Sequence, residues 1–186
     1  MPQAVDGTLR KFALRVPEVI YQCSGIMVFG KRIKSLVFST DLSIIKNVNA
    51  DAIIAVYPFT PQPIITQALL LAADIPVFAG VGGGLTKGQR VVNLAMFAEM
   101  QGATGVVVNA PISDEVISRI KQVVDIPVIA TIVSERMDIR SRMEAGADFL
   151  NVSGAAATPQ IVRSIRAQFP DVPILATGGP NDETIL

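Results

Sequence analysis

The sequence predicts an α/β fold, a (β/α)8 barrel of the TIM type in which seven β/α units are present and the eighth is missing. Three observations predict it: two short motifs recur alternately, each copy precedes a buried strand, and helical patterns separate the strands. Strands that alternate with helices form a parallel sheet, which leaves a doubly wound open sheet possible. Repeated units of uniform length favour the closed barrel.

The first motif is an aspartate and a proline at the start of an apolar run. It begins at Asp74 (DIPVFAG), Asp125 (DIPVIAT) and Asp171 (DVPILAT), at intervals of roughly 50 residues. Proline lacks a backbone N–H and pushes the preceding residue into an extended conformation. Each copy therefore marks the mouth of a strand.

The second motif alternates with the first and begins at Asn49 (NADAII), Gly102 (GATGVV) and Gly146 (GADFLN). Its two glycines fall where a helix should end, a position that favours a left-handed residue. β-branched apolar runs follow each copy. Together the motifs and runs predict seven strands, near residues 35–39, 52–57, 76–80, 105–109, 127–132, 148–153 and 173–177.

Helix starts are predicted between these strands. Thr60-Pro61 and Thr158-Pro159 each combine a capping residue with a proline at the first helical position. Ser113 is expected to cap a further helix, whose first turn carries Asp114 and Glu115 where the helix dipole favours them.

Two parts of a single domain are expected. Residues 1–34 are predicted to form a leading helix over 1–24 and a small hairpin or plug at the barrel floor from Gly25 to Ile33. Residues 35–186 are predicted to form the barrel. The sequence stops after the seventh strand, which we interpret as truncation before the eighth unit.

Composition excludes several classes of function. The 16 basic and 16 acidic residues balance, and no long basic run is present, so we expect no nucleic-acid partner. No apolar run reaches the roughly 18 residues of a membrane-spanning helix, so we expect no membrane partner. The single cysteine, Cys23, fits a reducing cytoplasm, and we interpret it as a buried structural thiol.

The chain has no histidine, which removes the commonest general acid/base and the commonest metal ligand. A zinc site of the usual Cys/His type is excluded. Catalysis would use carboxylates, lysine, tyrosine, hydroxyls or backbone amides. We expect no cofactor and no metal.

Active sites of such barrels lie at the carboxyl ends of the strands. Polar residues recur there at nearly the same offset, at Asn109, Thr131, Asn151 and Thr177. Such residues can instead cap the next helix or bond to loop backbone. We expect Asn109 or Asn151 to orient a substrate and Thr131 to contact it.

An anion site is predicted after the seventh strand. The glycines of Thr177-Gly178-Gly179 allow backbone amides to approach a phosphate, and the start of the next helix adds a positive dipole end. Ser153 and Gly154, after the sixth strand, could add a hydroxyl and another amide.

Two carboxylates are candidate general acids or bases, Glu135 and Asp41. Asp41 follows the first strand of the barrel, and Glu135 follows the strand that carries Thr131. Asp41, like Asp114 and Asp182, can equally serve as a helix cap.

The segment from Val77 to Arg90 (VFAGVGGGLTKGQR) has the look of a nucleotide-binding loop. It fails the Walker pattern because Lys87 precedes a glycine and no hydroxyl follows, and it fails the dinucleotide pattern at Leu85. We interpret it as a mobile lid in which Gly82 and Gly83 approach a substrate. Lys87 is either a solvated loop charge or a contact to a phosphate or carboxylate.

The segment FLNVSGAAATPQIVRSIRAQFPDVPILATGGPNDETI resembles the family of 2-keto-3-deoxy-6-phosphogluconate and 4-hydroxy-2-oxoglutarate aldolases. The resemblance implies a (β/α)8 barrel that is often a homo-oligomer, a lyase of carbohydrate metabolism. It also implies a phosphate or carboxylate held by the loop from Thr177 to Gly179.

The catalytic residues of that family do not carry over. Its Schiff-base lysine would fall at Asn151, and asparagine forms no imine. Its acid/base glutamate lies on the second strand, but residues 52–60 contain no carboxylate. Three hypotheses remain: other groups perform the chemistry, Lys87 is a relocated amine nucleophile, or the barrel binds a metabolite without turnover.

The sequence thus predicts a cytoplasmic, homo-oligomeric, phosphate-binding barrel enzyme. Its partner would be a small phosphorylated or carboxylated metabolite, a sugar or keto acid, and its chemistry that of a lyase without the usual lysine. The alternatives are a sugar-phosphate isomerase or epimerase and a non-catalytic regulatory barrel.

Overall fold

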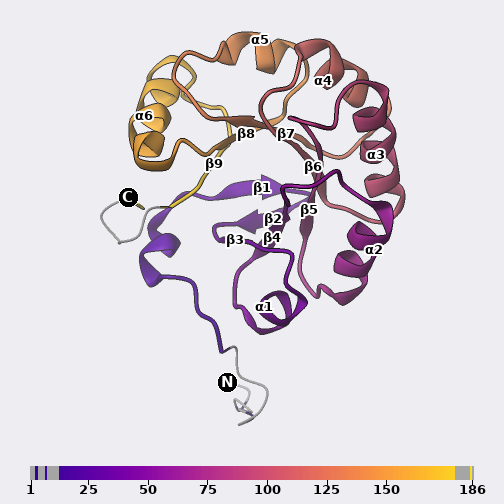
Figure 1. Cartoon of the computed structure of the whole chain (residues 1–186). Coiled ribbons are helices and arrows are strands. Elements are labelled where there is room, and N and C mark those ends of the chain that lie inside the picture. The colour runs from indigo at the N-terminus through magenta and orange to yellow at the C-terminus, as the bar shows by residue number, and fades with distance from the viewer. Residues whose placement is uncertain (1–2, 4–6, 8–12, 179–184, 186) are drawn as a thin grey trace.

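The computed structural model describes residues 3, 7, 13–178 and 185 (Figure 1). Its main sheet has seven parallel strands in the order of the sequence. They are β3 (Leu36–Phe38), β4 (Ala52–Ala55), β5 (Val77–Gly82), β6 (Gly105–Val108), β7 (Val128–Ile132), β8 (Phe149–Val152) and β9 (Ile174–Ala176). All seven predicted strands are confirmed. The sheet curls as part of a barrel, and in the described part of the chain β9 and β3 do not pair.

One helix connects each pair of consecutive strands and lies on the outside of the curled sheet (Figure 1). They are α1 (Leu42–Asn47), α2 (Pro63–Ala72), α3 (Gln89–Met100), α4 (Asp114–Lys121), α5 (Ile139–Glu144) and α6 (Thr158–Gln168), the last preceded by the 3-10 helix η2 (Ala155–Ala157). None of the helices that the structure describes is long and apolar enough to cross a membrane.

Successive side chains of a strand point to opposite faces of the sheet, and both faces are buried here. Val106, Val108 and Val128 pack in the cluster that the outer helices cover. Val107 and Ile129 belong to a second cluster on the inner face of the sheet.

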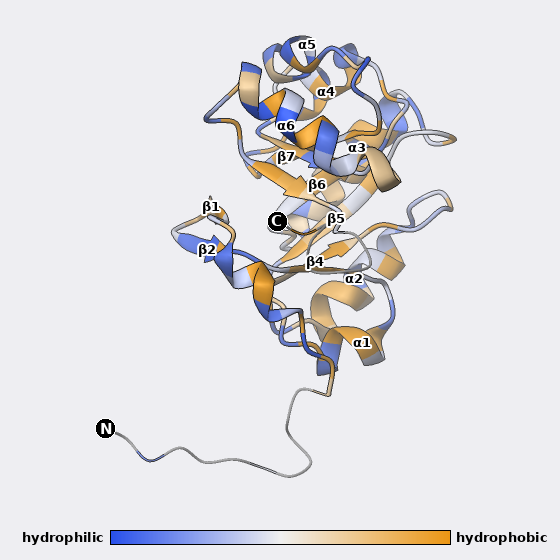
Figure 2. Ribbon diagram, turned by 90° about the vertical axis from the view of Figure 1, so that its left-hand side faces the viewer, coloured by the Kyte–Doolittle hydropathy of each residue, from blue (hydrophilic) through white to orange (hydrophobic). Residues whose placement is uncertain are grey.

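An antiparallel hairpin closes the inner face. Its strands are β1 (Ile26–Val28) and β2 (Lys31–Ile33), and Figure 1 shows it within the curl of the sheet. Ile26, Val28 and Ile33 are buried in the inner cluster. The backbone N–H groups of Lys34 and Ser35 donate to Asp51 Oδ2 (2.8 and 3.1 Å) beside the start of β4, which places the hairpin at the barrel floor. Figure 2 shows the same hairpin beside the strands, with hydrophilic residues on β2.

Three expectations about helices need correction. α2 begins at Pro63, not Pro61, with Gln62 at its cap position, and the Thr60 hydroxyl accepts a hydrogen bond from Thr86 Oγ1 (3.2 Å). α6 does begin at Thr158, but Thr158 Oγ1 accepts from Gly154 N (2.9 Å) and does not cap the helix. Ser113 occupies the cap position of α4 without a capping hydrogen bond from its side chain.

The expected leading helix over residues 1–24 also differs from the structure. Among the described residues of this segment, helical structure is limited to the 3-10 helix η1 (Glu18–Gln22). Pro17 immediately precedes it with ψ of 134°, and Val16 before the proline is restricted to extended conformations, so a continuous helix cannot pass through.

Candidate functional site

Three of the recurrent polar residues meet at the carboxyl ends of neighbouring strands. Asn151 Nδ2 donates to Thr131 Oγ1 (3.2 Å), and Thr131 Oγ1 donates to Asn109 Oδ1 (3.2 Å). We call this the Asn–Thr–Asn chain. Each member lies two residues beyond an inner-face side chain, namely Val107, Ile129 and Phe149. The side chains of Asn109, Thr131 and Asn151 therefore face the inside of the barrel.

The Asn–Thr–Asn chain has a direction. A threonine hydroxyl has one proton, and Thr131 gives it to Asn109 Oδ1. Asn109 consequently presents its Nδ2 donors elsewhere, and they have no partner among the described residues. Asn151 and Thr131 are buried, with 3% and 8% of their surface exposed, so the orientation is set inside the protein. The Asn109 amide group can therefore donate neutral N–H hydrogen bonds to an oxygen atom of a ligand at the mouth of the barrel.

Asn109 also lines a hollow of about 250 Å³ over the ends of β4, β5 and β6. One wall is the connection from β4 to α2, with Val56, Tyr57, Pro58 and Phe59. The facing wall is the glycine-rich loop of residues 82–86. Among the described residues that line it, there is no Asp, Glu, Lys or Arg.

The base of the glycine-rich loop is held by backbone hydrogen bonds, and its role as a lid stays a prediction. Gly83 N donates to Thr86 O (3.0 Å), Gly84 N to Pro111 O (3.1 Å) and Asn109 N to Gly82 O (2.8 Å). Gly83 has a φ of +108°, and a Cβ there would lie 2.0 Å from Asn109 O. Only glycine permits the loop to pack this closely on Asn109.

The charged candidates lie outside this arrangement. Lys87 and Glu135 are exposed, and neither lines the hollow or bonds to the Asn–Thr–Asn chain. Asp41 caps α1 by accepting from Ser43 N (2.7 Å) and Ile44 N (3.3 Å). These N–H groups, Ile44 first and then Ser43, hold the pKa of Asp41 below its ordinary value.

The predicted anion loops have few free amides. Ser153 N donates to Ile132 O (2.9 Å), and Gly154 N is taken by Thr158 Oγ1 (2.9 Å). Thr177 N donates to Val152 O (3.0 Å), whereas the rest of Thr177 and Gly178 are exposed. Gly179, like Asp182, lies outside the described residues. A phosphate site at this loop stays a prediction.

Sequence reasoning missed the apolar wall of the hollow. Phe59 and Leu85 are exposed at its rim, and the Tyr57 hydroxyl accepts from Gln62 N (2.7 Å). A signal was available, because residues 52–73 contain no charged side chain. Such a stretch next to a strand end is compatible with an apolar ligand wall.

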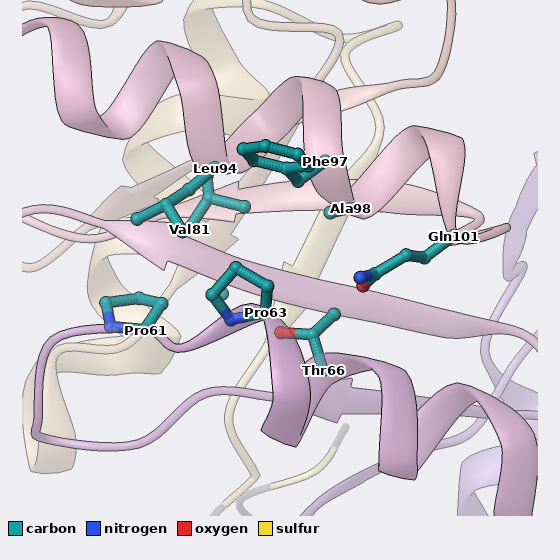
Figure 3. Close-up of a pocket in the computed structure, with 9 residues that line it drawn as sticks. Pro61, Pro63, Thr66, Val81, Leu94, Phe97, Ala98 and Gln101 are labelled. Atoms are coloured by element: carbon teal, nitrogen blue, oxygen red, sulfur yellow. The ribbon is translucent and has the colours of Figure 1, made fainter.

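A second, smaller cavity of about 10 Å³ lies between α2, α3 and β5 (Figure 3). Gln101 Oε1 is buried there without a hydrogen-bond partner in the described structure. The space suits one water molecule rather than a substrate. Elsewhere in the described residues, no three His, Cys, Asp or Glu side chains gather as metal ligands do.

No protein-family model and no curated protein matches the chain. Solved structures do. A candidate phosphonomutase from Burkholderia cenocepacia J2315 has a TM-score of 0.58 at 19% identity, over 76% of each chain. A phosphonopyruvate hydrolase in complex with oxalate and Mg²⁺ has 0.55 at 16%, over 69% of this chain and 60% of that one. Dihydrodipicolinate synthase from Aquifex aeolicus has 0.54 at 20%, over 70% and 53%.

The chain therefore has a fold of the TIM-barrel type, and its described part is a curled seven-stranded portion of such a barrel. It spans between about half and three quarters of the length of these structures. These structures do not specifically support the narrower resemblance to 2-keto-3-deoxy-6-phosphogluconate aldolases.

Proposed function

We propose that the protein is an enzyme that binds a small 2-keto acid, or a phosphorylated relative, at the mouth of the barrel and cleaves it in a lyase-type reaction. The observation that carries the proposal is the Asn–Thr–Asn chain, which directs the Asn109 amide group at the edge of a hollow. Position supports it as well, because barrels of this kind place their active sites at the carboxyl ends of the strands.

The chemistry requires no imine. When the bond between the α and β carbons of a β-hydroxy ketone breaks, its electron pair forms an enolate whose charge lies on the ketone oxygen. The β-hydroxyl loses its proton and becomes the carbonyl group of the second product. Oriented N–H donors stabilise such an oxyanion in a site that excludes water. Asn109 Nδ2 supplies the donor, and the buried Thr131 and Asn151 fix its orientation. Glu135 is exposed in the turn that follows β7 and does not line the hollow, but it is the carboxylate nearest in sequence to Thr131, and we propose it as the acid/base that takes the β-hydroxyl proton and returns it to the α carbon.

The names of the similar structures support the substrate class. Phosphonopyruvate is a 2-keto acid that carries a phosphonate, and oxalate is a small dicarboxylate bound in the structure of that hydrolase. Because the likeness is one of fold, its extension to this chain belongs to the proposal.

A non-catalytic metabolite-binding barrel is the second candidate. The observation in its favour is that the described residues lining the hollow include no charged side chain to move a proton. The relocated-nucleophile hypothesis is separate from both. Borohydride trapping with pyruvate tests it, and we expect no adduct because Lys87 does not line the hollow.

The deciding experiment incubates the protein with a panel of 2-keto acids, with and without Mg²⁺, while NMR follows products and thermal shift follows binding. Asn109→Ala is compared with Asn93→Ala, an exposed asparagine on α3. Turnover that Asn109→Ala removes and Asn93→Ala retains supports the enzyme. Stabilisation without product supports the second candidate. The absence of both turnover and stabilisation would contradict both candidates.

A further inference from the structure

We infer that the hollow beside Asn109 is a subsite for an uncharged, carbon-rich tail of the substrate. The inference rests on the proposed function, because Asn109 belongs both to the Asn–Thr–Asn chain and to the lining of the hollow. The substrate is then a 2-keto acid whose oxygen-bearing head lies at Asn109 and whose tail extends toward the glycine-rich loop.

The lining excludes a charged tail. Val56, Pro58, Phe59 and Leu85 present carbon, and the described lining residues include no Asp, Glu, Lys or Arg. A carboxylate or phosphate that entered would lose its hydration without gaining an ionic partner. Uncharged tails pay no such penalty.

Two hydroxyls of the lining take part in hydrogen bonds within the protein. The Tyr57 hydroxyl accepts from Gln62 N (2.7 Å), and the Thr86 hydroxyl donates to Thr60 Oγ1 (3.2 Å). Asn109 Nδ2 keeps its donors for the substrate. The hollow thus combines apolar side chains with backbone and hydroxyl groups and has Asn109 at one end, which suits an uncharged amphipathic small molecule.

The rim and the size of the hollow fit a short tail. Phe59 and Leu85 are 74% and 90% exposed, so an apolar tail that lay against them would remove apolar surface from water. The volume of about 250 Å³ leaves room for a tail of a few carbons. The close packing of Gly83 on Asn109 fixes the wall nearest the head group.

The test is a calorimetric titration series on the wild-type protein. The ligands are pyruvate, 2-oxobutanoate, 2-oxopentanoate and 2-oxohexanoate, with 2-oxoglutarate as the charged counterpart of 2-oxopentanoate. We expect Kd to fall about threefold to fourfold for each added methylene, the value of a buried CH₂. 2-Oxoglutarate should bind at least tenfold more weakly than 2-oxopentanoate.

Two variants test whether the dependence of Kd on tail length arises in the hollow. Leu85→Asp puts a charge on the rim, and Leu71→Asp puts one on α2, where the side chain is also exposed (80%) but does not line the hollow. Leu85→Asp should abolish the gain from 2-oxobutanoate to 2-oxohexanoate, and Leu71→Asp should keep it. A series that binds with no dependence on tail length or tail charge overturns the subsite and leaves the proposed function standing. If none of these 2-keto acids binds, the result contradicts both the proposed function and the subsite.

Discussion

Thr131 and Asn151 are direct partners in the register of β7 and β8, and Asn151 Nδ2 donates a 3.2 Å hydrogen bond to Thr131 Oγ1. The resemblance to the aldolases would place an imine-forming lysine at Asn151. A buried amide and a buried hydroxyl cannot form that imine, but they can hold Asn109 in one orientation.

Replacement of Thr131 by valine keeps the shape of the side chain and removes the hydroxyl. Asn151 Nδ2 then loses its buried acceptor, and we expect a loss of about 1–3 kcal/mol in the free energy of unfolding, measured in urea. Because Asn109 is no longer oriented, turnover or ligand affinity should fall about 10- to 100-fold. Thr131→Ser, which keeps the hydroxyl, should restore most of both, and equal losses in the two variants would argue against the Asn–Thr–Asn chain.

Gly83→Ala tests the packing of the glycine-rich loop on Asn109. The new methyl group would lie 2.0 Å from Asn109 O, at a φ of +108°, so we expect a cost of about 2 kcal/mol or more. Gly84→Ala is the matched control, because its φ is also positive (+65°) but nothing lies within 4 Å, and it should cost about 1 kcal/mol. Thermal unfolding of both variants measures the difference, and equal costs would show that the loop is not held against Asn109.

Glu135→Gln tests the acid/base proposal. Proton transfer contributes about 100- to 10,000-fold to such reactions, so kcat should fall by at least about 100-fold while the circular dichroism spectrum stays unchanged. Glu144→Gln, which replaces an exposed glutamate at the end of α5, is the control and should retain activity. Full activity in Glu135→Gln would remove Glu135 from the mechanism.

Asp41 predicts a pH dependence of stability. Its pKa is lowered in the folded protein by the N–H groups of Ile44 and Ser43, so the ionised form contributes stability above the ordinary aspartate pKa. That contribution is lost as the pH falls through the lowered pKa. Asp41→Ala should therefore unfold more readily than the wild type at neutral pH, and the difference should shrink in acid. Denaturation curves across pH measure it, and a gap that persists unchanged in acid would contradict the role of the charge.

Much of the fold was predictable because its signals are local. Proline after Asp74-Ile75 and after Asp125-Ile126 marks a strand wherever it occurs, and the apolar runs that follow are buried on both faces. The common offset of Asn109, Thr131 and Asn151 was visible for the same reason.

The remaining features depend on contacts between distant segments. Thr60 bonds to Thr86, and α2 starts at Pro63, two residues after the expected Pro61. The Gly83 loop is fixed by Asn109 and its neighbours, which lie one β/α unit later. Periodicity and capping rules carry no information about such contacts.

A crystal structure of the protein with 2-oxopentanoate bound tests most directly whether Asn109 binds the keto-acid head. We expect an oxygen of the keto-acid head to lie within about 3 Å of Asn109 Nδ2. The tail should lie in the hollow between Phe59 and Leu85. A ligand bound only at Thr177 and Gly178, or at any place away from Asn109, would contradict this expectation.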